Sequence, residues 1–125
     1  MNKPIHTDNA PAAIGPYSQA IQAGPLLFVS GQLPLNPATG AFAGDDIASQ
    51  TRQSLTNLRS ILEAAGYSCA DVVKTTVLLA DIGDFAAMNA VYAEFFTENC
   101  PARAAFAVKD LPKGALVEIE AVASR

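Results

Sequence analysis

Apolar residues recur at helical spacing in two segments of the chain. From Asp45 to Gly66 they return every three or four residues, a period that predicts an amphipathic helix. Asp45 or Asp46 can cap its first turn, and Gly66 is well placed as its C-cap. Residues 84–99 carry a broader apolar stripe and predict a second helix, with Asp84 as its N-cap.

Shorter runs of β-branched and apolar residues predict strands. Residues 71–81 have the composition of a central strand, and residues 17–24 and 26–31 form a predicted hairpin. Two more strands, 103–111 and 116–124, end the chain. They are joined by a turn made of Pro112, Lys113 and Gly114.

The order of these elements indicates the fold class. A hairpin, a helix, a strand, a helix and two strands predict an α+β fold in a single domain, residues 1–125, with two helices on one face of a mixed sheet. The other face must be covered as well, or it would be exposed and rather apolar. Hydrophobic residues make up 50% of the chain and charged residues only 16%, against about 25% in average domains. This surplus of apolar residues suggests subunit interfaces.

Charge and composition argue against several classes of function. The formal charge of −4 disfavours nucleic-acid binding, which rests largely on basic side chains that neutralise phosphates. No stretch approaches the roughly 18 apolar residues of a membrane span, and the N-terminus lacks the apolar core of a signal peptide. We therefore expect a soluble, cytoplasmic protein without membrane contact. Cys69, Cys100 and His6 form no ligand pattern, which predicts two free thiols and no metal site.

Arg103 is the first candidate for chemistry. It stands alone between a Pro-Ala turn and an apolar run, and a guanidinium is almost never buried without a partner. It either points into solvent, pairs with a carboxylate of the protein, or waits for an external anion. The small neighbours Ala102, Ala104 and Ala105 leave space beside it, which suits bidentate binding of a carboxylate.

Two glutamates of the last predicted strand, Glu118 and Glu120, share one face of that strand. If the last two strands pair as a hairpin, Arg103 and a glutamate can lie on the same side of the sheet. One interpretation is then an ordinary cross-strand ion pair near a sheet edge. The other is a site in which the arginine binds an anion.

Four longer stretches of the chain carry a resemblance. They are APAAIGPYSQAI, VSGQLPLNPATG, DVVKTTVLLADIGDFAAMNAVYAEFF and PARAAFAVKDLPKGALVEIEAVA. Together they resemble the RidA (YjgF) family of reactive-intermediate deaminases, and the likeness runs nearly from end to end. The Pro-Ala-Arg turn followed at this spacing by a Glu-Ile-Glu strand is more specific than either piece alone.

The resemblance implies a fold, an assembly and an activity. The fold would be chorismate-mutase-like, in a homotrimer whose three sheets form an inner barrel and whose active sites lie between neighbouring subunits. The implied activity is hydrolysis of enamines and imines, such as 2-aminoacrylate, 2-iminobutanoate and 2-iminopropanoate, to 2-keto acids and ammonia. These substrates would arise from pyridoxal-phosphate-dependent dehydratases, and the family uses no metal or organic cofactor.

Carried over residue by residue, the resemblance implies that Arg103 binds the substrate carboxylate and that Glu118 holds or activates the attacking water. The implied substrate-binding residues are Tyr17, Ser30, Gly31, Asn89 and Ala105. Plainer interpretations stay open for three of them. Tyr17 could be an ordinary half-buried tyrosine, Gly31 could mark a bulge or turn, and Asn89 could be a solvent-facing helix residue.

The chain departs from the family pattern at two points. Ala105 stands where familiar members carry a cysteine, which puts a thiol-based role in doubt but leaves a backbone contact intact. The loop before the Pro-Ala-Arg turn is short, which could reshape the wall of the cleft. Glu120 is interpreted as a surface charge outside the site.

Two other functions remain open. A regulatory module that binds small keto acids without turnover would use the same arginine. An endoribonuclease-type translation inhibitor, a label attached to some members of the family, is disfavoured by the acidic charge and the single histidine.

Overall fold

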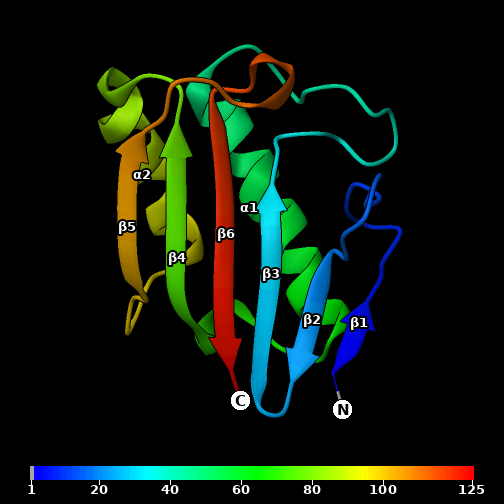
Figure 1. Cartoon of the computed structure of the whole chain (residues 1–125). Helices are drawn as coiled ribbons and strands as arrows, with labels where there is room; N and C mark the ends of the chain where they lie inside the picture. Colours follow the sequence, from blue (N-terminus) through cyan, green and yellow to red (C-terminus); the bar gives the residue numbers. More distant parts are fainter. Residues whose placement is uncertain (1) are drawn as a thin grey trace.

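A six-stranded mixed sheet carries both helices on one of its faces (Figure 1). The computed structural model describes residues 2–125. The strands are β1 (Lys3–Ile5), β2 (Ala20–Ala23), β3 (Leu26–Gln32), β4 (Val72–Leu79), β5 (Ala102–Ala107) and β6 (Val117–Ser124). Their order across the sheet is β1-β2-β3-β6-β4-β5. Neighbouring strands are antiparallel except β4 and β5, which run parallel.

The predicted N-cap of the first helix is confirmed, whereas its C-cap lies one residue before the predicted Gly66. Helix α1 (Ile47–Ala64) begins after Asp46, whose carboxylate accepts a hydrogen bond from the backbone N–H of Ser49 at 3.0 Å. After the C-cap residue, Ala65, the chain turns at Gly66 with a left-handed φ of 84°. Glycine adopts this conformation without the steric cost that a Cβ would bring.

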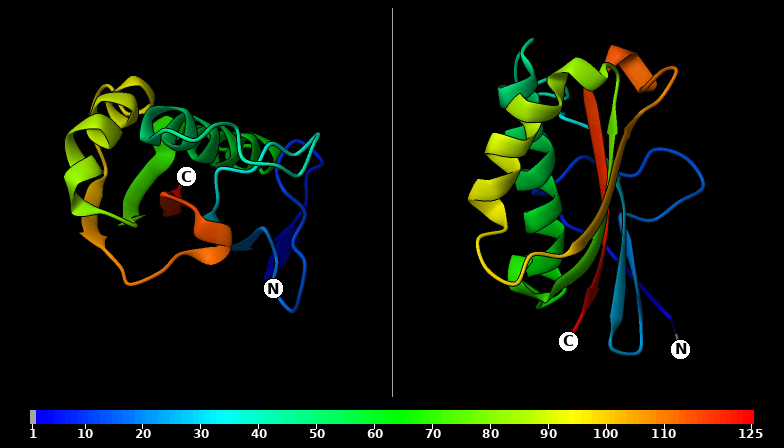
Figure 2. Two further views of the ribbon diagram at one scale, coloured as in Figure 1. Left: turned by 90° about the horizontal axis from the view of Figure 1, so that it is seen from above. Right: turned by 90° about the vertical axis from the view of Figure 1, so that its left-hand side faces the viewer.

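The second helix, α2 (Phe85–Phe95), is shorter than the predicted segment. Asp84 stands at its N-cap, but its side chain makes no capping hydrogen bond. The short 3-10 turn that leads into α2, Ile82–Asp84, is capped instead. Its N-cap residue, Asp81, accepts a hydrogen bond on its carboxylate from the N–H of Gly83 at 2.8 Å. Figure 2 shows α1 and α2 side by side on the same face of the sheet.

The hydrophobic core lies between the sheet and the helices. Alternate residues of the inner strands point toward α1 and α2 and are at most 3% exposed: Leu27, Val29, Val77, Leu79, Val117 and Ile119. They pack against Leu55, Leu58, Ile61, Leu62 and Met88 of the helices. The predicted α+β fold with both helices on one face is therefore confirmed.

The opposite side of the sheet, here called the open face, carries no helix (Figure 2). Phe28 pairs with Val122 across β3 and β6, and both side chains point to this side. Phe106 and Glu118 share it, because both pair with Leu78 of β4. Phe28 and Phe106 remain 46% and 48% exposed. The apolar second face that the composition predicted is thus present and uncovered in the single chain.

Two strand predictions fail. The sequence analysis missed β1, because three residues that include Pro4 are too few to show an alternating pattern. The predicted terminal hairpin is wrong, because β5 and β6 lie on opposite sides of β4. β4, α2 and β5 form a β-α-β unit, and such a unit pairs its two strands in parallel.

Within residues 2–125, no helix is long and apolar enough to cross a membrane.

Candidate functional site

Arg103 lies on the edge strand β5 and faces helix α2. Its Nη1 donates a hydrogen bond to Oδ1 of Asn89 at 2.6 Å. Its guanidinium carbon lies 4.8 Å from the ring centroid of Tyr92 and 5.4 Å from that of Phe85. No carboxylate within residues 2–125 forms an ion pair with Arg103. The interpretation as a cross-strand ion pair is therefore wrong, and the exposed guanidinium is free to bind an external anion.

The aromatic ring beneath this arginine is itself fixed. Tyr92 is 6% exposed, and its hydroxyl shares a hydrogen bond of 2.7 Å with Oγ1 of Thr75 on β4. Burial raises the pKa of the Tyr92 hydroxyl above its usual value, so it stays protonated at neutral pH. Arg103 is thus held on a rigid surface by α2 and β4, while its Nε and Nη2 have no acceptor in the described part of the chain.

Glu118 lies on β6 and points to the open face. Burial, and then repulsion from Glu120, raises the pKa of its carboxyl above the usual value. A raised pKa makes the ionised carboxylate a stronger base than an ordinary glutamate. Gly31 of β3 leaves room for it, because a Cβ on Gly31 would overlap Oε2 of Glu118 and lie 2.9 Å from its Cδ.

A β-bulge shapes the chain beside Glu118. Ser30 and Gly31 of β3 together oppose a single residue of β6, Glu120, so the interpretation of Gly31 as a bulge residue is confirmed. Ser30 also fastens the segment before β2: its Oγ donates to the carbonyl of Ser18 at 2.6 Å, and its N–H donates to that of Gln19 at 3.0 Å. These bonds hold the preceding residue, Tyr17, close to the bulge.

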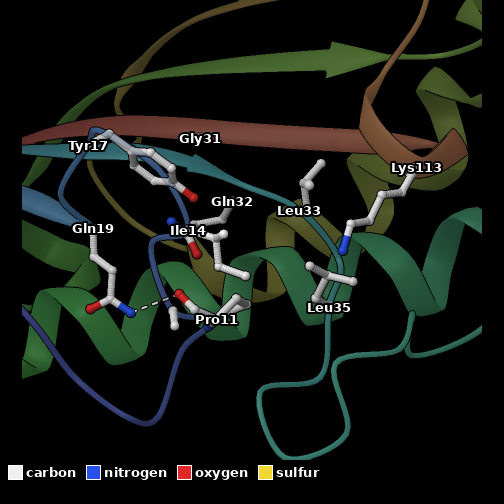
Figure 3. A pocket seen from close by; sticks show the side chains of 10 residues that line it. Pro11, Ile14, Tyr17, Gln19, Gly31, Gln32, Leu33, Leu35 and Lys113 are labelled. Atoms are coloured by element: carbon white, nitrogen blue, oxygen red, sulfur yellow. Dashed lines mark hydrogen bonds between the residues drawn. The ribbon is translucent and has the colours of Figure 1, made fainter.

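A cavity of about 310 Å³ adjoins this corner of the sheet. Tyr17 and Gly31 line one end of it, and Lys113 lines the other (Figure 3). The Tyr17 residue is 56% exposed, so it lines the cavity while about half of its surface remains in contact with solvent. The walls of the cavity are mostly apolar, with a few polar side chains, which is the usual character of a small-molecule site.

The predicted site residues form two groups. Tyr17, Ser30, Gly31 and Glu118 make the first, here called the glutamate group. Arg103 and Asn89, with Phe85 and Tyr92, make the second, the arginine group. Ala105 lies two residues beyond Arg103 on β5 and packs against the core. Asn89 is solvent-exposed on α2, as its plainer interpretation expected, and it also accepts the hydrogen bond from Arg103.

The sheet separates these two groups. Arg103 pairs with Thr75 of β4 and shares its side, toward the helices. Glu118 pairs with Leu78 of β4 and shares the opposite side. One small ligand therefore cannot contact both charged side chains of a single chain.

Among the described residues, no three His, Cys, Asp or Glu side chains gather as a metal site.

Comparison with known proteins decides the family. Residues 7–125 match the family described as Endoribonuclease L-PSP. The chain is also 52% identical, over 98% of its length, to the YjgF gene product of E. coli, whose crystal structure it matches with a TM-score of 0.95 and covers to 98%. The chain belongs to the RidA (YjgF) family. The resemblance found in the sequence is thus confirmed.

Relatives in the RidA family match the chain over nearly its whole length. A RutC family protein of Pyrococcus horikoshii is 58% identical over 123 residues, which are 98% of each chain. A 2-iminobutanoate/2-iminopropanoate deaminase of Salmonella typhimurium is 52% identical over 128 residues, which span 100% of this chain and 99% of the relative.

Sequence reasoning missed three residues that surround the predicted RidA site. Phe85 and Tyr92 were assigned only to the apolar stripe of α2, and Lys113 only to a turn. A signal was present for the first two. Phe85, Asn89 and Tyr92 are spaced four and three residues apart, which places them on one helix face with a polar residue between two aromatic ones.

Proposed function

We propose that the protein is an enamine/imine deaminase that hydrolyses 2-imino acids, such as 2-iminobutanoate and 2-iminopropanoate, to 2-keto acids and ammonia. The observation that carries the proposal is the state of Arg103, which is held by Asn89 and yet has no carboxylate partner among residues 2–125. The deaminase of Salmonella typhimurium, 52% identical over the full chain, supports this assignment.

Arg103 binds the substrate carboxylate in this proposal. Its Nε and Nη2 point two N–H donors in one plane, the geometry that matches the two oxygens of a carboxylate. Asn89 occupies Nη1, and the aromatic rings of Tyr92 and Phe85 limit how the guanidinium can rotate. A substrate held in this way arrives with a fixed orientation, which by itself accelerates a reaction with water.

Glu118 acts on the water. Its carboxylate takes a proton from the water as the oxygen bonds to the imine carbon, and the C=N bond becomes a C–N single bond. Glu118 passes this proton to the nitrogen, which gives an amino alcohol. It then takes the hydroxyl proton as the C–O bond becomes the keto C=O and the C–N bond breaks, and this second proton goes to the nitrogen that leaves as ammonia. Glu118 is ionised again at the end. The reaction is a hydrolysis, with no change in oxidation state.

The proposed assembly is a homotrimer with its sites between neighbouring copies. Arg103 and Glu118 point to opposite sides of the sheet, so a complete site needs the arginine group of one copy and the glutamate group of the next. The open face supports this arrangement, because exposed phenylalanines on a sheet favour burial against a second copy.

Imines generated by a serine or threonine dehydratase test the activity. Purified protein should accelerate imine decay and ammonia release, and Arg103→Ala should lower kcat/KM by about 10- to 150-fold, the value of one charge-assisted contact. Arg103→Lys keeps the charge but not the planar guanidinium, so its kcat/KM should be nearly as low as that of Arg103→Ala. Arg52→Ala is the matched control, because Arg52 pairs with Glu94 on the helices and should leave the rate unchanged.

Two results would overturn the proposal. Saturable binding of 2-keto acids by well-folded protein, without any acceleration of imine decay, would show a binding module. RNA cleavage that disappears in Arg103→Ala would show an endoribonuclease, whereas cleavage that survives this change would indicate a contaminant.

A further inference from the structure

The cavity beside Gly31 is a built feature of the fold. Gln19, 2% exposed, fixes one wall: its side-chain amide accepts from the N–H of Thr7 at 2.7 Å and donates to the carbonyl of Pro11 at 2.8 Å (Figure 3). Asn57, fully buried on α1, fixes the other. Its Nδ2 donates to the carbonyl of Leu33 at 3.1 Å and to that of Leu35 at 2.8 Å. Two buried amides therefore hold the cavity open before any ligand binds.

Lys113 lies at the end of this cavity away from Tyr17. Its side chain runs from the turn before β6 toward Leu33 and Leu35 (Figure 3). The ammonium forms no hydrogen bond or ion pair with any residue of the described chain. A cation at the end of an apolar cavity is complementary to a ligand with an apolar middle and an acceptor at its tip.

The backbone at Lys113 is an independent sign of a role. Its φ of 59° and ψ of 18° lie in the left-handed region, which few residues other than glycine adopt. The next residue, Gly114, has a φ of 72°. Gly114 adopts this backbone conformation without strain, and a glycine at position 113 would do so as well. The lysine at position 113 therefore costs some stability of the fold. Such strain is commonly stored where a side chain is needed for function.

We propose that this cavity is the side-chain pocket of the deaminase and that Lys113 selects 2-imino acids whose side chain ends in a carboxylate or carboxamide. The proposal rests on the proposed deaminase function. The imine carbon of a 2-imino acid carries three groups: nitrogen, carboxylate and side chain. With the carboxylate on Arg103 of a neighbouring copy and the carbon near Glu118, the side chain is the group left to enter the cavity beside Gly31.

The size of the cavity agrees with this class of substrate. A volume of about 310 Å³ lies at the lower end of the range for small-molecule pockets, roughly 300–1,000 Å³. This is more space than the methyl or ethyl side chain of 2-iminopropanoate or 2-iminobutanoate fills. The remaining space runs along Leu33 and Leu35 to the ammonium of Lys113.

A matched set of imines tests the selection. L-Amino-acid oxidase generates them in place from glutamate, glutamine, norleucine and alanine, and the full-length protein is assayed on each. Lys113→Met keeps an unbranched side chain that is one atom shorter and removes its charge. We expect this variant to lower kcat/KM for the glutamate- and glutamine-derived imines about 10- to 150-fold, the size of one charge-assisted hydrogen bond. The norleucine- and alanine-derived imines should react as with wild type.

Lys113→Gly separates selection from folding. It removes the ammonium and relieves the left-handed backbone, so its melting temperature should equal or exceed that of wild type while the selectivity is lost. Equal loss on all four imines, or no loss on the glutamate- and glutamine-derived ones, would overturn the selection by Lys113. Failure of the proposed deaminase function looks different, because the wild-type protein would then not act on the alanine-derived imine either.

Discussion

The guanidinium of Arg103 lies over the ring of Tyr92, with 4.8 Å between its central carbon and the ring centroid. The ring cannot turn away, because its hydroxyl is bonded to Thr75 at 2.7 Å. The arginine is therefore oriented by a helix residue that is anchored in turn to the sheet. This order of support explains how an exposed arginine on an edge strand can keep one direction without a carboxylate partner.

Replacement of Tyr92 should weaken substrate binding more than it slows the chemical step. Tyr92→Leu removes the ring, and a cation–π contact of about 0.5–2 kcal/mol corresponds to a rise in KM of roughly 2- to 30-fold with a smaller change in kcat. Tyr92→Phe keeps the ring and loses only the bond to Thr75, so its KM should stay near that of wild type. Steady-state kinetics on both variants checks this, and equal KM values for Leu and Phe would contradict it.

Gly31 and Glu118 are predicted to be coupled. Gly31→Ala places a Cβ against the Glu118 carboxylate, which must move, so we expect lower thermal stability and loss of deaminase activity. The loss of stability should shrink when Glu118→Ala removes the carboxylate that the new methyl meets. A double-mutant cycle on melting temperatures measures this coupling. Additive effects of the two changes would show that the alanine acts through the backbone instead.

The ionisation of Glu118 should make the folded protein less stable above acid pH. Its pKa is higher in the folded than in the unfolded chain, so the folded state holds the proton more tightly. Stability from this group is present below the ordinary glutamate pKa and is lost as the pH rises through the raised value. Glu118→Gln should therefore raise the melting temperature at pH 7 and leave it nearly unchanged at low pH.

The control for the pH dependence is Glu63→Gln, at an exposed position of α1. It should change the melting temperature little at either pH.

Glu118→Gln should also abolish imine hydrolysis, because an amide cannot accept the proton of the water. An increase in stability that is equal at both pH values would argue against ionisation as the cause.

Phe106→Glu should dissociate the assembly. Phe106 is 48% exposed on the open face, and a charge there would have to be buried without a partner in a second copy. We expect light scattering to show a shift from the trimer toward the 13.0 kDa chain, with loss of activity. Ile82→Glu, at a site 55% exposed in the turn before α2, should leave the assembly intact. A monomeric wild type would contradict the proposal directly.

The sequence predicted the elements whose pattern is strong. α1 has a cap at Asp46, regular apolar spacing and a glycine after its end, and the structure places it within two residues of the expected bounds. β4 has a run of β-branched residues that fits only a strand covered by others. In these segments local propensity and tertiary burial favour the same conformation.

The sequence could not predict how β5 and β6 are placed. Pro112, Lys113 and Gly114 have the composition of a hairpin turn, yet the chain crosses there from the sheet edge to the other side of β4. That choice depends on the parallel pairing that α2 imposes on β5, which no local pattern records. The separation of Arg103 from Glu118 on the two sides of the sheet was hidden for the same reason.

Subunit complementation tests the central claim, a site shared between two copies, most directly. Arg103→Ala and Glu118→Gln chains are each expected to be inactive. After they are unfolded together and refolded at equal amounts, some interfaces combine the intact Arg103 of one chain with the intact Glu118 of the other. The account predicts about a quarter of the wild-type activity, because random assembly makes about one interface in four complete. No recovery of activity in mixed, correctly assembled trimers would contradict it.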